Sequence, residues 1–124
     1  MKSRWIEHQG TPIFYIDFSH FGRDFVALRG EIEAVLSVFE SQPLDSVLCM
    51  ADFRDTDISR GVTALIKGSA PQIGPHVRKA AIILEEAASG FKSLIVTALA
   101  RVGGRGAVLF DDVEQARDWL VGDE

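Results

Sequence analysis

Short apolar runs alternate with longer stretches of helical periodicity, and this alternation is the clearest pattern along the chain. The apolar runs cover residues 13–18, 47–51, 80–84 and 107–110. Turn-forming or charged residues bound each run, which is typical of short strands that are covered on both faces. Between the runs, apolar residues return every three or four positions, which is typical of helices with one buried face.

Four helices are expected from this periodicity. They are predicted from Asp24 to Phe39, from Asp57 to Ala70, from Ser89 to Val102 and from Asp111 to Leu120. Pro71 is expected to end or kink the second helix near Ala70, because proline removes a backbone hydrogen bond. Asp111 and Glu114 have the spacing of a capping box that would open the last helix.

Short strands separated by helices cannot pair as hairpins and need right-handed crossovers, which produce parallel pairing. The segment from Trp5 to Gln9 is a candidate for one more strand at the sheet edge. The sequence therefore predicts a single α/β domain over residues 1–124, with a mostly parallel sheet of four or five strands and about four helices.

The composition and charge of the chain exclude several classes of function. The 124 residues are 47% hydrophobic and carry a formal net charge of -5, so nucleic acid, which needs a basic footprint, is not expected as the main partner. No apolar run reaches the roughly 20 residues of a membrane span, and no secretory signal pattern is visible. The single cysteine, Cys49, excludes an internal disulfide framework. We expect a cytoplasmic protein.

The loops after the strands are where a ligand or partner site is expected in a parallel sheet. The loop that follows the second apolar run carries the densest group of polar side chains. These candidate residues for a partner or phosphorylation loop are Asp52, Arg54, Asp55, Thr56, Asp57 and Ser59. Capping of the following helix by Asp57 or Thr56 is the more common explanation of acids and hydroxyls at such a position, and a regulatory or ligand-contacting role is the alternative.

No complete catalytic or metal-binding pattern accompanies this loop. His20 and His76 should lie at opposite ends of the sheet, so they cannot share a metal, and His8 falls in the edge segment. The nucleophile elbow of a serine hydrolase is absent. Gly103 to Gly106 follows a helix, whereas phosphate-binding loops follow a strand. We therefore expect no cofactor, no metal and no enzymatic activity.

A resemblance to a known family rests on several short stretches. They are Tyr15-Ile16-Asp17-Phe18-Ser19, Pro75 to Ala80, Gly104-Arg105 and the ending from Leu109 to Leu120. Together they resemble the small bacterial SpoIIAA-like proteins, which share the STAS-like fold of anti-sigma-factor antagonists and are grouped with the CRAL-TRIO lipid carriers. The resemblance implies a mixed sheet with helices and a protein-binding role. In STAS relatives a partner kinase phosphorylates a serine at the start of the second helix, and the resemblance implies that Ser59 or Thr56 occupies that place, although the Asp-Ser-Ser-Gly motif of those relatives is not reproduced here.

These observations lead to a non-enzymatic STAS-like binding or regulatory module that recognises a protein partner through residues 52–61. The alternative is a carrier of a small apolar molecule or lipid. Its pocket residues would be Phe18, Phe21, Phe25, Phe53 and Ile58. Self-association as a symmetric homodimer is compatible with the chain, and exposed aromatic residues would mark the interface. The candidates for that role are Trp5, Phe21 and Trp119.

Overall fold

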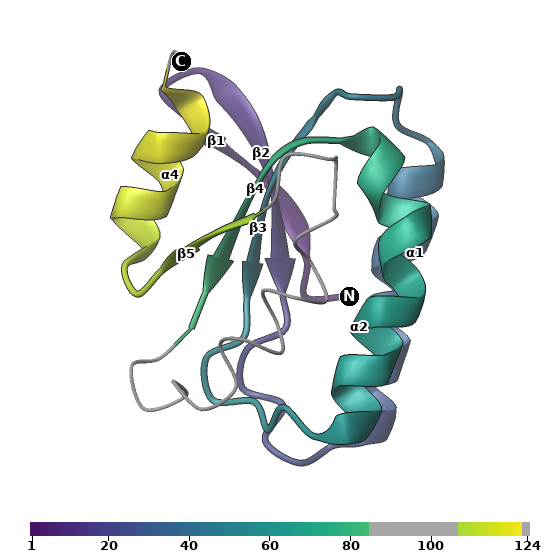
Figure 1. Ribbon diagram of the computed structural model, residues 1–124. Coiled ribbons are helices and arrows are strands. Elements are labelled where there is room, and N and C mark those ends of the chain that lie inside the picture. The colour runs from purple at the N-terminus through teal and green to yellow at the C-terminus, as the bar shows by residue number, and fades with distance from the viewer. Residues whose placement is uncertain (85–106, 123–124) are drawn as a thin grey trace.

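The computed structural model describes residues 1–84 and 107–122 of the chain (Figure 1). The strands are β1 (Arg4–His8), β2 (Thr11–Asp17), β3 (Val47–Asp52), β4 (Val77–Ile83) and β5 (Ala107–Phe110). The α-helices are α1 (Phe25–Glu40), α2 (Arg60–Ile73) and α4 (Val113–Val121), and a short 3-10 turn, η1, spans Gly74–His76. The predicted helix from Ser89 to Val102 lies outside the described residues.

One mixed sheet contains all five strands in the order β1-β2-β3-β4-β5. The edge strand β1 is antiparallel to β2, whereas β2, β3, β4 and β5 run parallel. The α/β class, the mostly parallel sheet and the edge strand near Trp5 are thereby confirmed. The three α-helices of the described residues lie where the periodicity predicts them, apart from their ends.

The three α-helices that the structure describes are divided between the two faces of the sheet. In Figure 1, α1 and α2 lie side by side on one face and α4 lies on the other. The larger apolar core fills the space under α1 and α2, and it includes Phe14, Phe39 and Ile82. A smaller core lies under α4, where Ala116 and Leu120 pack against Ile13, Met50 and Ala81.

Three predicted helix ends are wrong. Helix α2 begins at Arg60, with Ser59 as its N-cap, instead of at Asp57. Helix α2 continues through Pro71 to Ile73 instead of ending near Ala70. Pro71 lies in the last turn and is exposed, so the carbonyl that lacks its N–H partner can bond water, and the N–H of Gly74 closes the helix on the Ala70 carbonyl. The cap of α4 is Asp112 and not Asp111, because the Asp112 carboxylate accepts the N–H of Glu114.

Candidate functional site

Two loops meet at the carboxyl edge of the parallel strands. The loop after β2 (residues 18–24) and the loop after β3 (residues 53–59) both lead to helices on the same face, since the strand order is sequential. They leave the sheet in the same direction and pair with each other, through an isolated parallel bridge between Gly22 and Thr56. We call them the paired loops. They do not diverge into the crevice that a reversal of strand order would create.

Backbone hydrogen bonds join the paired loops along their length. The N–H of His20 donates to Arg54 O at 2.9 Å, and the N–H of Gly22 donates to Asp55 O at 3.0 Å. In the other direction, the N–H of Asp57 donates to Gly22 O at 2.8 Å. These bonds join two segments that lie more than thirty residues apart in the sequence, so they fix the conformation of the two loops relative to each other.

The same loops contain strained backbone. His20, with φ of 60°, and Asp55, with φ of 57°, occupy the left-handed region, which costs a non-glycine residue about 1–2 kcal/mol. The two side chains also pair, because His20 Nδ1 lies 3.1 Å from Asp55 Oδ2. The loop pairing must hold this conformation in place.

The candidate residues at this edge have separate tasks. The hydroxyl of Thr56 donates to Phe18 O at 2.5 Å and accepts the N–H of Phe21 at 3.1 Å, so it stitches the two loops together. Ser59 caps α2, because its hydroxyl accepts the N–H of Val62 at 3.2 Å. Asp55, Asp57 and Ser59 are exposed, whereas Thr56 is half-buried.

Asp52 and Arg54 form an ion pair on the α4 face of the sheet. Asp52 is fully buried, and Arg54 Nη2 lies 2.7 Å from its Oδ2. The hydroxyl of Tyr15 donates to the same carboxylate at 2.6 Å. Burial opposes ionisation of Asp52, but the hydrogen bonds from Arg54 and Tyr15 outweigh it and hold its pKa below the usual value. Burial, and then the bond to Asp52, raises the pKa of Tyr15 to about 12.

Asp17 lies beside Asp52 in the sheet register and repeats its local structure. Each carboxylate accepts the N–H of the residue two positions on: Ser19 for Asp17 and Arg54 for Asp52. Such turns are typical of aspartate at the end of a strand. Sequence reasoning missed Tyr15 and Asp17 as site residues, although the repeated Asp-Phe pair at the ends of two apolar runs was a signal.

The N-terminal residues lie at the same edge of the sheet and are bonded to helix α1. The carboxylate of Glu31, a buried residue of α1, accepts the N–H groups of Lys2 at 3.0 Å and of Ser3 at 2.8 Å. Burial opposes ionisation of Glu31, yet these bonds keep its pKa below the ordinary value. Sequence reasoning missed Glu31 as well, although a carboxylate inside an apolar helical stripe is unusual and could have indicated a buried partner.

A small hollow lies between the first turns of α1 and α2. It encloses about 210 Å³, including space open to solvent, and its lining comes from both paired loops and both helices. Phe25 borders it, with 38% of its surface exposed, and packs edge-on near Gly61, where an added Cβ would lie 3.1 Å from the ring. The neighbouring Val26 is 79% exposed. The paired loops are therefore flanked by an exposed apolar pair.

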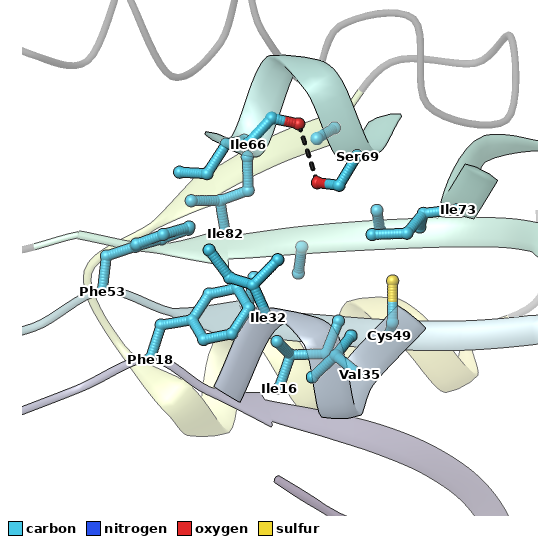
Figure 2. Close-up of a pocket in the computed structure, with 14 residues that line it drawn as sticks. Ile16, Phe18, Ile32, Val35, Cys49, Phe53, Ile66, Ser69, Ile73 and Ile82 are labelled. Carbon is cyan, nitrogen blue, oxygen red and sulfur yellow. Dashed lines mark hydrogen bonds between the residues drawn. The ribbon is translucent and has the colours of Figure 1, made fainter. Parts of the chain in front are cut away.

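A second cavity lies under α1 and α2, against the sheet (Figure 2). The space between its walls is about 540 Å³, part of it open to solvent. Among the residues that the structure describes, Ser69 alone contributes a side-chain oxygen to the lining, and its hydroxyl donates to Ile66 O at 2.9 Å. Phe18 and Phe53 line this cavity, as the carrier alternative predicts. Phe21, Phe25 and Ile58 do not belong to its lining. The Cys49 thiol faces the same space, and burial raises its pKa to about 12, which suits a small apolar side chain.

The remaining candidates do not form a site. His20 lies at the carboxyl edge and His76 at the opposite end, before β4, as predicted. Within residues 1–84 and 107–122, no three His, Cys, Asp or Glu side chains gather to hold a metal. Of the proposed interface aromatics, Trp5 is 43% exposed, whereas Trp119 packs under Lys79 and Phe21 under Lys2. None of the helices in the described part of the chain combines the length and apolar character that a bilayer span requires.

Comparisons of the chain with protein-family models, with curated proteins and with solved structures found no match.

Proposed function

We propose that the chain is a non-enzymatic, STAS-like binding or regulatory module that recognises a partner protein through the paired loops. The observation that supports this most directly is the pairing itself. Backbone bonds give residues 18–24 and 53–59 a defined shape, and the side chains that remain exposed there differ in chemistry. Recognition needs such a preorganised surface, because ordering a mobile loop on binding reduces affinity.

The exposed groups suit a protein better than a small polar ligand. Phe25 and Val26 supply apolar contact area, and Asp55 and Asp57 supply negative charge beside it. An apolar centre with a charged rim is the usual arrangement of a protein interface. The shallow hollow between α1 and α2 would accept one projecting side chain of the partner.

Of the two hydroxyls that the resemblance brings forward, Ser59 suits a phosphorylation switch and Thr56 does not. A kinase could reach the exposed Ser59 at the start of α2, whereas the Thr56 hydroxyl is used in two bonds between the loops. A phosphate on Ser59 would add a charge of roughly -2 next to Asp57 and change the surface offered to the partner.

The test compares two matched variants as baits in lysate of the source organism. Asp57→Arg with Val26→Asp alters the paired-loop surface, and Glu40→Arg with Leu44→Asp makes the same changes at exposed positions near the other end of α1. We expect a partner that binds wild type and the control pair but not the loop pair. A partner set that is the same for all three baits would rule the paired loops out as the recognition surface.

The apolar cavity supports a second candidate function, the carrying of a small apolar molecule. The described residues of its wall offer hydrocarbon, one thiol and one hydroxyl that is already bonded, so the ligand would be an uncharged chain or ring. Any charged group of that ligand would have to remain outside the cavity.

Native mass spectrometry of the purified full chain, followed by titration with an uncharged apolar dye, tests the carrier. Ala80→Leu fills the cavity from β4, and Ala64→Leu makes the same change at an exposed position of α2. We expect dye binding to be lost in the first variant and kept in the second. An apo mass together with no dye binding to wild type would exclude the carrier.

A further inference from the structure

The side chain of Lys2 touches the first of the paired loops, residues 18–24. Lys2 Nζ donates to Ser19 O and lies 4.2 Å from the centre of the Phe21 ring. Both contacts are with the loop after β2. The same ammonium group lies 3.7 Å from Asp17 Oδ1, at the point where β2 ends.

The backbone of this segment is fastened at both sides. Glu31 of α1 accepts the N–H groups of Lys2 and Ser3, and the hydroxyl of Ser3 accepts the N–H of Asp17 at 2.9 Å. Arg4 lies 3.5 Å from Asp17 and 4.8 Å from the centre of the Tyr15 ring. Residues 2–4 thus bridge α1 and the end of β2, the two elements between which loop 18–24 runs.

Loop 18–24 needs such support. It contains His20, a non-glycine residue with left-handed φ, and its backbone-to-backbone bonds with loop 53–59 are made by His20 and Gly22. A loop that stores strain in the backbone keeps its conformation only when its surroundings fix it. The contacts with Ser19 and Phe21 hold the loop just before and within this strained stretch.

We propose that residues 2–4 form a clamp that keeps the paired loops in their joined conformation, so that displacement of the N-terminal segment switches the loop surface off. This inference rests on the proposed function for its biological meaning, because it names how the same surface would be regulated. Its physical content is a coupling between Glu31 and the bonds of His20, Gly22 and Asp57, and it can be measured without any partner.

Amide hydrogen exchange on the full chain tests this coupling. The reporters are the amides of His20, Gly22 and Asp57, which are bonded only while the loops are paired. Glu31→Gln removes the charge that holds Lys2 and Ser3, and Glu33→Gln is the matched control at an exposed position of α1. We expect about tenfold faster exchange at the reporters in the first variant and wild-type rates in the control.

Two further variants separate the clamp from a general loss of stability. Lys2→Met keeps the Glu31 bonds but removes the contacts with Ser19 and Asp17, and Ser3→Ala removes the bond from Asp17 N. We expect both variants to accelerate hydrogen exchange at the reporter amides, while the amides in the centre of β3 and β4 stay protected from exchange. The clamp would be overturned if exchange accelerated equally at the reporter amides and at the amides of the sheet. It would also be overturned if exchange accelerated only at residues 2 and 3.

The partner assay then distinguishes the two proposals. If the exchange results support the clamp but loop variants keep every partner, the proposed function fails and the clamp stands. If loop variants lose the partner while Lys2→Met leaves the reporter amides unchanged, the recognition surface stands and the clamp fails.

Discussion

The two faces of the sheet are built from the same strands, yet they are closed by different interactions. Under α1 and α2, alternate positions of β2 and β3 are apolar along their whole length. On the α4 face, Ile13, Leu48 and Met50 are apolar, but the positions nearest the carboxyl ends of β2 and β3 are Tyr15, Asp17 and Asp52. Helix α4 covers the apolar part, and ion pairs and hydrogen bonds with Arg54 and the N-terminal residues satisfy the polar part.

This difference has a consequence for the carboxyl edge. Apolar packing is non-directional, so the α1/α2 face can be closed by side chains that only need to fit. Hydrogen bonds to buried carboxylates are directional, and on the α4 face they determine where the loop backbones begin. The face on which these buried carboxylates lie, the α4 face, is therefore the one that shapes the candidate recognition surface.

The largest expected effect comes from the apolar face. Phe14 is fully buried between Trp5 and Phe39, with ring centres 5.1 Å and 5.6 Å away. We expect Phe14→Ala to lower the free energy of unfolding by about 3–5 kcal/mol in urea titrations, because it leaves a cavity. Val26→Ala, at an exposed position, should change it by less than about 0.5 kcal/mol. A small loss for Phe14→Ala would contradict the assignment of the main core to this face.

The next effect concerns the polar face. Asp52→Ala removes a buried carboxylate and leaves Arg54 and the Tyr15 hydroxyl without it, at a cost of about 2–4 kcal/mol. The pKa of Asp52 is lower in the folded state than in the unfolded state. Its carboxylate therefore stabilises the fold fully above the unfolded-state pKa of about 4, and this stabilisation is lost as the pH falls through the folded-state pKa.

Urea titrations between neutral and acidic pH measure both parts of this prediction, with the exposed Asp57→Asn as control. The difference in stability between wild type and Asp52→Ala should shrink as the solution becomes acidic. A difference that is constant with pH would mean that the charge of Asp52 does not stabilise the fold.

A smaller effect separates the two hydroxyls of the paired loops. Thr56→Val leaves the N–H of Phe21 without its acceptor and should cost about 1–3 kcal/mol. Ser59→Ala removes a helix cap and should cost about 1 kcal/mol. Thermal unfolding ranks the two variants, and exchange at Gly22 should accelerate only in Thr56→Val. The reverse order would show that capping, and not loop stitching, is the main task of this segment.

The smallest expected effect is a change in the pKa of Tyr15. Tyr15 is the chain's single tyrosine, so phenolate absorbance reports this residue alone. The folded protein should ionise it near pH 12, and Asp52→Asn should lower that midpoint, because one cause of the raised pKa is removed. The raised pKa stabilises the fold fully below about pH 10 and less as pH rises towards 12. A midpoint that is the same in both proteins would exclude the Tyr15–Asp52 bond in solution.

Much of the architecture could be predicted from local pattern alone. The runs at 47–51 and 107–110 became strands, and α1 occupies the predicted stripe, because burial of one face depends on residues that are near each other in sequence. The helix ends at Pro71 and Asp111 were less predictable, since one or two hydrogen bonds decide them.

The candidate site could be predicted only in part. Residues 52–59 stood out by their polarity, but their tasks depend on contacts with residues 18–24, which strand pairing brings together. Glu31 and Ser3 did not stand out, because their bond joins residues 28 positions apart and no local pattern encodes it.

The sequence by itself determined the alternation of strands and helices, the parallel pairing that this alternation requires, and the polar character of the loop after β3. The tertiary structure decided the sequential strand order, the pairing of the two loops and the fastening of residues 2–4. The physical reason is range: periodic burial acts between neighbours in the chain, whereas register, loop pairing and buried ion pairs join distant segments whose positions only the assembled sheet defines.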